Sequence, residues 1–207
     1  NPADGNDVGA IVQDMLIQNA SGATTLLGNV FRGAGVDLTS PRPGSNVSVT
    51  SNTFAPLVPF FSQSLLVKNN TGTGVVSVTD NEFIGHSLGV LVGGSQNVTV
   101  ADNIFTPGTG VDYTHVLVDS RWPGASPVTT VPTDAIILGN VFNPGDPGVG
   151  TALKFQNLAN GEVTPEFDQI VIGGVGNENE FKAGIRRYIA LDATSGFEFD
   201  VNLTAGD

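Results

Sequence analysis

Two short motifs alternate along the whole chain, and this alternation constrains the fold more than any other feature. The first motif is Asn-x-Phe preceded by an alternating apolar pair, as in NVSVTSNTF, VVSVTDNEF and NVTVADNIF. The second is an apolar-x-apolar segment followed by a polar turn, as in MLIQNASG and LLVKNNTG. Sequence units that recur in a fixed order are typical of stacked repeat architectures.

The Asn-x-Phe motif and its looser copies suggest one column of Asn and one of Phe. Asn tolerates the left-handed backbone of a sharp corner, and stacked amides can hydrogen bond along a column. A Phe two residues later points to the same side and can stack inside. An alternative role for the Asn row is ligand binding. The expected column residues are Asn29, Asn52, Asn81, Asn103, Asn140 and Asn179, with Phe31, Phe54, Phe83, Phe105, Phe142 and Phe181.

A unit with two short alternating strands cannot bury its own apolar face, but parallel stacked copies can. The sequence therefore predicts an all-β fold, a single right-handed parallel β-helix of about seven coils over residues 1–207, with the handedness of parallel crossovers. An antiparallel sandwich would explain the strands but not the fixed order of the motifs. The coils are expected to end near Asn29, Asn52, Asn81, Asn103, Asn140, Asn179 and Asn202.

The Asn-x-Phe corners and the Val-x-Val strands before them resemble the pectate-lyase-like superfamily of right-handed β-helices, over about residues 11–203. That superfamily includes polysaccharide lyases and hydrolases, phage tailspikes, adhesins and non-catalytic surface proteins, so the resemblance does not select a function. Its polygalacturonases carry paired Asp motifs, Gly-His-Gly and Arg-x-Lys. The nearest string here is Gly85-His86-Ser87, and the adjacent Asp pair and Arg-x-Lys are absent. An enzyme is therefore the less favoured interpretation.

The charge balance restricts the partners. The chain has 20 acidic and 8 basic residues, a net charge of −12 and no Cys. Nucleic-acid binding needs clustered Lys and Arg, and a membrane span needs about 18 consecutive apolar residues; the sequence has neither. Without Cys there are no disulfides or thiolate metal sites. No metal or other cofactor is predicted, although loop carboxylates could hold Ca²⁺. His86 and His115 belong to different repeat positions, and His115 is expected to face solvent or cap a corner.

Two corners are much longer than the others. They lie between Val118 and Asn140 and between Phe155 and Asn179, in successive units, so they are expected side by side on one edge. Long loops on a rigid scaffold commonly carry binding residues. Trp122, the single Trp, either grips a sugar ring or partner, or seals its own loop. The candidate binding residues are Asp119, Arg121, Trp122, Asp134, Glu162, Glu166 and Asp168.

The ends suggest self-association. A short N-terminal capping helix is favoured, with Asp7 as its cap and an apolar face made of Val8, Ile11, Val12, Met15 and Leu16. The segment from Met15 to Gln18 also reads as a strand. FEFDVNL near the other end alternates as a strand with little sequence after it to cover an open coil. The favoured function is a non-catalytic, extracellular or cell-surface structural or adhesive module that assembles end to end. The alternative is a polysaccharide-binding or polysaccharide-degrading β-helix; a glycan or cell-surface partner is expected at the long-loop edge.

Overall fold

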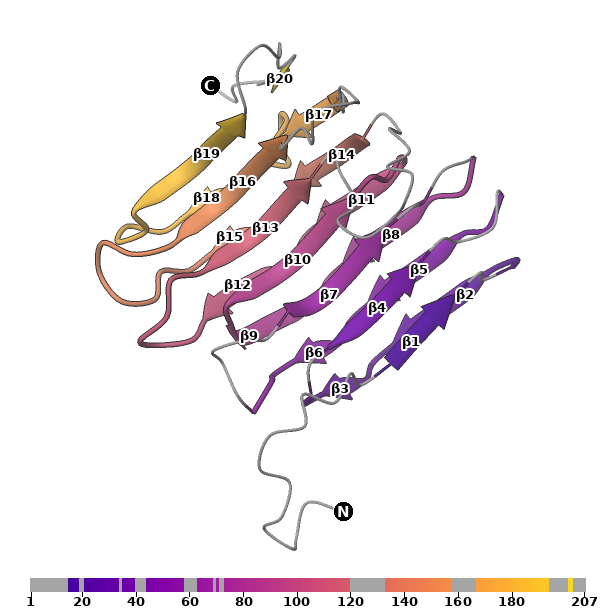
Figure 1. Ribbon diagram of the computed structural model, residues 1–207, viewed down its shortest axis with the longest axis horizontal. Coiled ribbons are helices and arrows are strands. Elements are labelled where there is room, and N and C mark those ends of the chain that lie inside the picture. The colour runs from indigo at the N-terminus through magenta and orange to yellow at the C-terminus, as the bar shows by residue number, and fades with distance from the viewer. Residues whose placement is uncertain are drawn as a thin grey trace, which may run out of the picture.

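The computed structural model describes residues 15–18, 21–33, 35–39, 44–57, 63–68, 70, 73–119, 133–157, 167–193 and 201–202. Within these ranges the regular elements are strands in three parallel sheets. Sheet A contains β1 (Met15–Gln18), β4 (Val36–Thr39), β7 (Gln63–Lys68), β10 (Leu88–Gly93), β13 (Thr114–Asp119), β16 (Thr151–Asn157) and β19 (Arg187–Ala193). Figure 1 shows these strands as a row from indigo to yellow.

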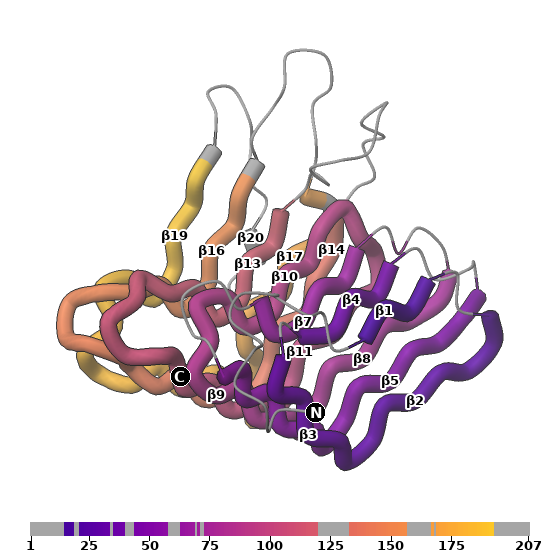
Figure 2. Tube along the Cα trace, turned by 60° about the horizontal axis from the view of Figure 1, so that its bottom comes forward, coloured from indigo at the N-terminus to yellow at the C-terminus, as the bar shows by residue number. Residues whose placement is uncertain are grey.

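Sheets B and C complete each coil. Sheet B contains β2 (Thr24–Leu27), β5 (Val47–Thr50), β8 (Val76–Thr79), β11 (Val98–Ala101), β14 (Thr133–Leu138), β17 (Phe167–Ile172) and β20 (Val201–Asn202). Sheet C contains β3 (Val30–Phe31), β6 (Thr53–Phe54), β9 (Glu82–His86), β12 (Ile104–Pro107), β15 (Val141–Phe142) and β18 (Glu180–Phe181). Each strand pairs with its counterpart one coil away, and Figure 2 shows the successive coils side by side.

The predicted right-handed parallel β-helix is confirmed. The expectation of two strands per coil was wrong, because the residues that follow each Asn form a third strand. Four of the six strands in sheet C have only two residues, too few for an apolar alternation to be visible in the sequence. The corner that the motif marks therefore separates two sheets, B and C.

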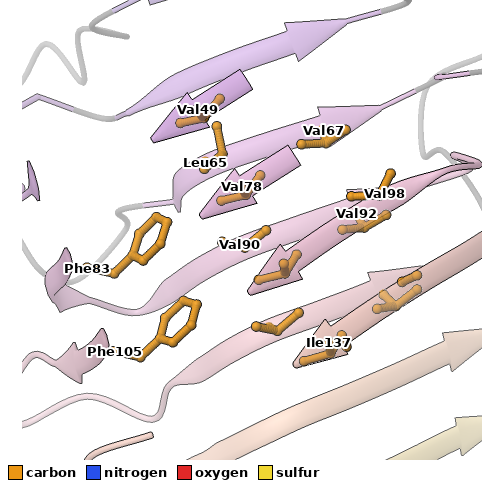
Figure 3. Packing of buried hydrophobic residues seen from close by; sticks show 14 of the residues in the cluster. Val49, Leu65, Val67, Val78, Phe83, Val90, Val92, Val98, Phe105 and Ile137 are labelled. Atoms are coloured by element: carbon orange, nitrogen blue, oxygen red, sulfur yellow. The ribbon is translucent and has the colours of Figure 1, made fainter. Parts of the chain in front are cut away.

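Inward side chains at the same register position form continuous columns through the core. In sheet A, Leu65 pairs with Val90 and Val67 with Val92, and all four are fully buried. Phe rings form a further column against sheet C, with centroids 4.7 Å apart from Phe54 to Phe83 and again from Phe83 to Phe105. Figure 3 shows the rings of Phe83 and Phe105 beside the aliphatic columns. Burying such side chains contributes roughly 1.5–3 kcal/mol each, so packing between coils stabilises the solenoid.

The Asn side chains are hydrogen bonded along the corner between sheets B and C. The backbone N–H and Nδ2 of Asn52 both donate to Oδ1 of Asn81, at 2.9 and 3.0 Å. Asn81 donates in the same way to Asn103, also at 2.9 and 3.0 Å. The same two bonds join the other neighbouring pairs from Asn29 to Asn179. We call this arrangement the Asn ladder.

The left-handed backbone lies one residue before the position expected from the sequence. Ser51, Asp80 and Asp102 have φ values of 54°, 57° and 57°, and each precedes a ladder Asn. Gly28 and Gly139 occupy the same place in their coils, with φ values of 68° and 60°. The preceding residue makes the turn, which leaves the Asn amide free to hydrogen bond between coils.

Three further expectations concern the ends of the chain. Met15 and Leu16 lie in strand β1 and not in the expected capping helix, whose remaining residues fall outside the described part of the chain. Asn202 pairs with Val171 inside sheet B, several positions before the ladder corner, so it does not continue the Asn ladder. Among the described residues, no helix has the length and apolar character needed to cross a membrane.

Candidate functional site

The two long corners leave and re-enter the solenoid from neighbouring strands. The first leaves sheet A after β13 and returns at β14, and the second leaves after β16 and returns at β17. Strands β13 and β16 pair in sheet A, and β14 and β17 pair in sheet B. The ends of both corners are therefore adjacent, while Arg121, Trp122, Glu162 and Glu166 within them lie outside the described residues.

The remaining candidates from the sequence lie at the ends of strands. Asp119 is the last residue of β13, and its side chain is only 3% exposed, in contrast to the exposed carboxylate that the sequence suggested. Nε2 of Gln156, the residue paired with it in β16, donates to Asp119 Oδ2 at 3.1 Å. Asp134 Oδ1 accepts a hydrogen bond from the backbone N–H of Asn97. Asp168 lies in β17, and its side chain is outside the described part. Asp119 and Asp134 thus both hold neighbouring coils together.

A hollow of about 750 Å³ lies over strands β13, β16 and β19 of sheet A. Its floor includes Thr114, Thr151 and Arg187, which occupy the same register position on these three strands. Leu117 and Lys154 are paired at a second position, three residues farther along the strands. The hollow thus has hydroxyl, aliphatic and cationic side chains close together, and we refer to it as the sheet A hollow.

The sheet A hollow brings three cations together on an acidic chain, along with the carboxylates of Asp112 and Asp192. Lys154, Arg186 and Arg187 all line it, which is three of the eight Lys and Arg residues in the sequence. Lys154 Nζ lies 3.0 Å from Asp192 Oδ2. Nη2 of Arg186 contacts both carboxylate oxygens of Asp112, at 3.2 and 3.0 Å. Solvent-exposed pairs of this kind contribute about 0–1 kcal/mol each, so an incoming anion can compete for these cations.

One wall of the hollow is a rigid corner built around Tyr113. The Tyr113 hydroxyl accepts a hydrogen bond from the Gly145 N–H at 3.0 Å, and Asp112 Oδ1 accepts one from the Gly150 N–H at 3.0 Å. A Cβ on Gly150 would lie 2.1 Å from the Tyr113 ring, and its φ of +80° also favours glycine. Burial raises the pKa of Tyr113 above its usual value, so the hydroxyl remains protonated at neutral pH.

Beneath this wall lies a buried pair of histidines, in contrast to the solvent-facing or capping position expected for His115. His86 and His115 are both 0% exposed, and His86 Nε2 lies 2.9 Å from His115 Nδ1. His115 Nε2 lies 2.9 Å from the Asn143 carbonyl and must donate to it. The Nδ1 of His115 is then an acceptor, so His86 Nε2 donates to it.

The histidine pair is neutral at physiological pH. Burial lowers the pKa of His115 to about 3. Burial and the neighbouring His115 lower the pKa of His86 well below its usual value. Phe105 and Tyr113 pack against His115, with ring centroids 5.7 and 4.8 Å away, so a proton added here would be held in an aromatic environment. The pair forms a buried hydrogen bond between two neutral rings within the core.

The sequence did not predict this hollow or the grouping of the residues that line it. Lys154 and Arg187 lie within strands that show only the repeat pattern, and the register that brings them together is visible only in the folded chain. The described residues contain no group of three or more His, Asp or Glu side chains that could hold a metal ion. Neither protein-family models, curated protein sequences nor solved structures gave a match to this chain.

Proposed function

We propose that this protein is a non-catalytic structural and adhesive β-helix of the extracellular space or cell surface. In this proposal it is a divergent relative of the pectate-lyase-like superfamily. The solenoid serves as a rigid support, and the sheet A hollow is its contact surface. The observation that carries the proposal is the concentration of Lys154, Arg186 and Arg187 in one hollow of a chain whose net charge is −12.

The proposed partner is a polymer that carries carboxylate groups, such as an acidic polysaccharide. Cations in a hollow attract an anion over the repulsion of the remaining acidic surface. The exposed ion pairs of Lys154 and Arg186 can be exchanged for contacts with a ligand carboxylate at little net cost. The Thr114 and Thr151 hydroxyls supply neutral hydrogen-bonding groups on the same surface.

Charge reversal on the floor of the hollow tests this function. We expect Lys154→Glu and Arg187→Glu each to weaken binding to uronate-rich polysaccharides on a glycan array, and binding of the wild type to fall as salt rises. Lys182→Glu is the matched control, because Lys182 is exposed, pairs with Glu180 and follows sheet C, outside the residues that line the hollow. Equal binding by the wild type and both hollow variants would rule out this contact surface.

A second candidate is a polysaccharide-degrading activity at the same hollow, favoured by the presence of Asp112 and Asp192 among its lining residues. Glycoside hydrolysis uses two carboxyl groups that flank the scissile bond. In the free protein each of these carboxylates pairs with a cation. Release of new reducing ends by the wild type, abolished in Asp112→Asn or Asp192→Asn, would favour this candidate over simple adhesion.

A further inference from the structure

The two ends of the described solenoid expose opposite edges of the same sheets. Strand β1 is the first and β19 the last of sheet A, and β2 and β20 hold the same places in sheet B. Among the described strands, each of these four pairs with a neighbour on one side only. Because all strands in a sheet are parallel, the outer edge of β19 is directed correctly to pair with the outer edge of β1 from another molecule.

The apolar columns of sheet A are open at the β19 end. Ile189 is paired with Leu153 and Leu191 with Phe155, so both lie at interior register positions. Leu153 and Phe155 are 0% exposed, whereas Ile189 is 39% and Leu191 is 56% exposed. Side chains that are buried in the inner coils are therefore accessible in the last strand of the sheet.

The same two columns begin at the β1 end. Met15 is paired with Val36 and Ile17 with Leu38, which are the first fully buried members of the columns. Met15 and Ile17 are partly buried and pack against the core cluster. Thus β1 offers two apolar side chains with the same spacing as Ile189 and Leu191, on a strand of the same direction.

From this match we infer that the partner for the β19 end is the β1 end of a second copy of this chain. Extending the register places Met15 of the second molecule next to Ile189, and Ile17 next to Leu191. Sheet C ends one strand earlier than sheets A and B within the described residues, so the contact is made by sheets A and B. A head-to-tail contact does not close on itself and therefore gives a filament. The contact lies beside the sheet A hollow, because Ile189 and Leu191 also line that hollow.

A charge at the exposed column position tests the contact. We expect wild-type sedimentation to show oligomers that grow with protein concentration, and Leu191→Lys to weaken this association by about tenfold or more. Ile104→Lys is the matched control, because Ile104 is 44% exposed in β12, a strand in the middle of sheet C. A wild type that stays monomeric at its highest soluble concentration, or a Leu191→Lys variant that associates like the wild type, would overturn the inference.

Cross-linking tests the register itself, on side chains that do not enter the core. Leu16 and Ala190 lie at one outward register position of sheet A, linked through Asp37, Leu66, Leu91, Leu117 and Lys154. Paired positions on adjacent strands are about 4.8 Å apart, within disulfide range. The natural chain has no Cys, so mild oxidation of Leu16→Cys/Ala190→Cys should give a ladder of covalent oligomers on a non-reducing gel.

The control for cross-linking is Leu16→Cys/Ile104→Cys, which has the same number of thiols without the register match. It should remain largely monomeric under the same oxidation. Oligomer ladders of equal intensity from both double variants, or from neither, would contradict head-to-tail pairing of β1 with β19. Circular dichroism and a thermal melt on each variant show that the solenoid is intact before oxidation.

Discussion

Nε2 of His86 donates a hydrogen bond to Nδ1 of His115 across 2.9 Å, and neither side chain is exposed to solvent. With His115 donating onward to the Asn143 carbonyl, the remaining His86 Nδ1 is a buried acceptor that no donor among the described residues reaches. Two neutral rings satisfy this geometry, and a proton on either one would be a charge in the core. The pair therefore connects the stability of the solenoid to pH.

Acidification should destabilise the protein before its carboxylates protonate. The folded pKa values of both histidines are lowered, so below about pH 6.5 the unfolded chain binds more protons than the folded one. The free energy of unfolding should fall by about 2 kcal/mol per histidine between pH 7.5 and pH 5, from linkage with an unfolded pKa near 6.5. Urea denaturation at a series of pH values measures this slope.

The control for this pH dependence is a double variant that removes both titrating groups. His86→Leu/His115→Leu replaces each imidazole with an apolar side chain and should flatten the stability profile between pH 7.5 and pH 5. The test compares the slope of the free energy of unfolding with pH, and not the stability of the variant at pH 7.5. A profile as steep as that of the wild type would mean that other groups cause the acid sensitivity.

Removing an Asn from the middle of the ladder should cost more than removing one from its end. In Asn81→Ala, the Asn52 N–H and the Val49 carbonyl lose partners in a buried environment. Each buried unsatisfied group costs about 1–3 kcal/mol, so we expect a loss of about 3 kcal/mol. Asn29 is exposed at the first coil, and Asn29→Ala should cost about 1 kcal/mol. Denaturant midpoints of the two variants measure the difference; equal losses would contradict the expected dependence on position in the ladder.

Gly150→Ala tests whether Tyr113 fixes the wall of the hollow. A methyl group would meet the ring at 2.1 Å on a backbone with φ +80°, so the ring must move. Gly110→Ala is the matched control, because its φ is +76° but no atom lies within 4 Å of its added Cβ. The control should lose about 1 kcal/mol from backbone strain, and Gly150→Ala clearly more. Near-ultraviolet circular dichroism should change in Gly150→Ala alone. Unchanged spectra in both variants would show that the corner around Tyr113 accommodates the added methyl group.

The sequence was sufficient for the solenoid because its regularity is a property of the repeats. Val76 and Val98, or Phe83 and Phe105, stand at matching places in successive motifs, and parallel stacking is the arrangement that buries all of them. Sheet C escaped detection because a strand such as Val141–Phe142 is too short to alternate visibly. The left-handed turn residue was misplaced because Asp80 and Asn81 both tolerate that conformation, and only the hydrogen bonds decide between them.

The candidate site depended on positions that the repeat pattern does not distinguish. His86 and His115 lie in different motifs, and their contact arises because β9 extends past its Phe while β13 begins nearby. Arg187 and Lys154 line the same hollow only because of the register between β16 and β19. Asp119 was expected in a loop because a long loop follows it, yet a strand that ends at Asp119 places this carboxylate beside Gln156. Local sequence indicates which residues recur, whereas pairing between coils determines which residues outside the repeat pattern come together.

The one-way hydrogen bonding of the Asn ladder also has a mechanical meaning. Every link of the ladder runs from one coil to the next, so the ladder bonds each coil only to adjacent coils. A pull along the axis of the solenoid therefore loads the coils in series, and the weakest junction, at an end, opens first. A pull across the axis loads many links at once. Such a rod resists bending and shear as a unit but loses its coils one at a time under tension.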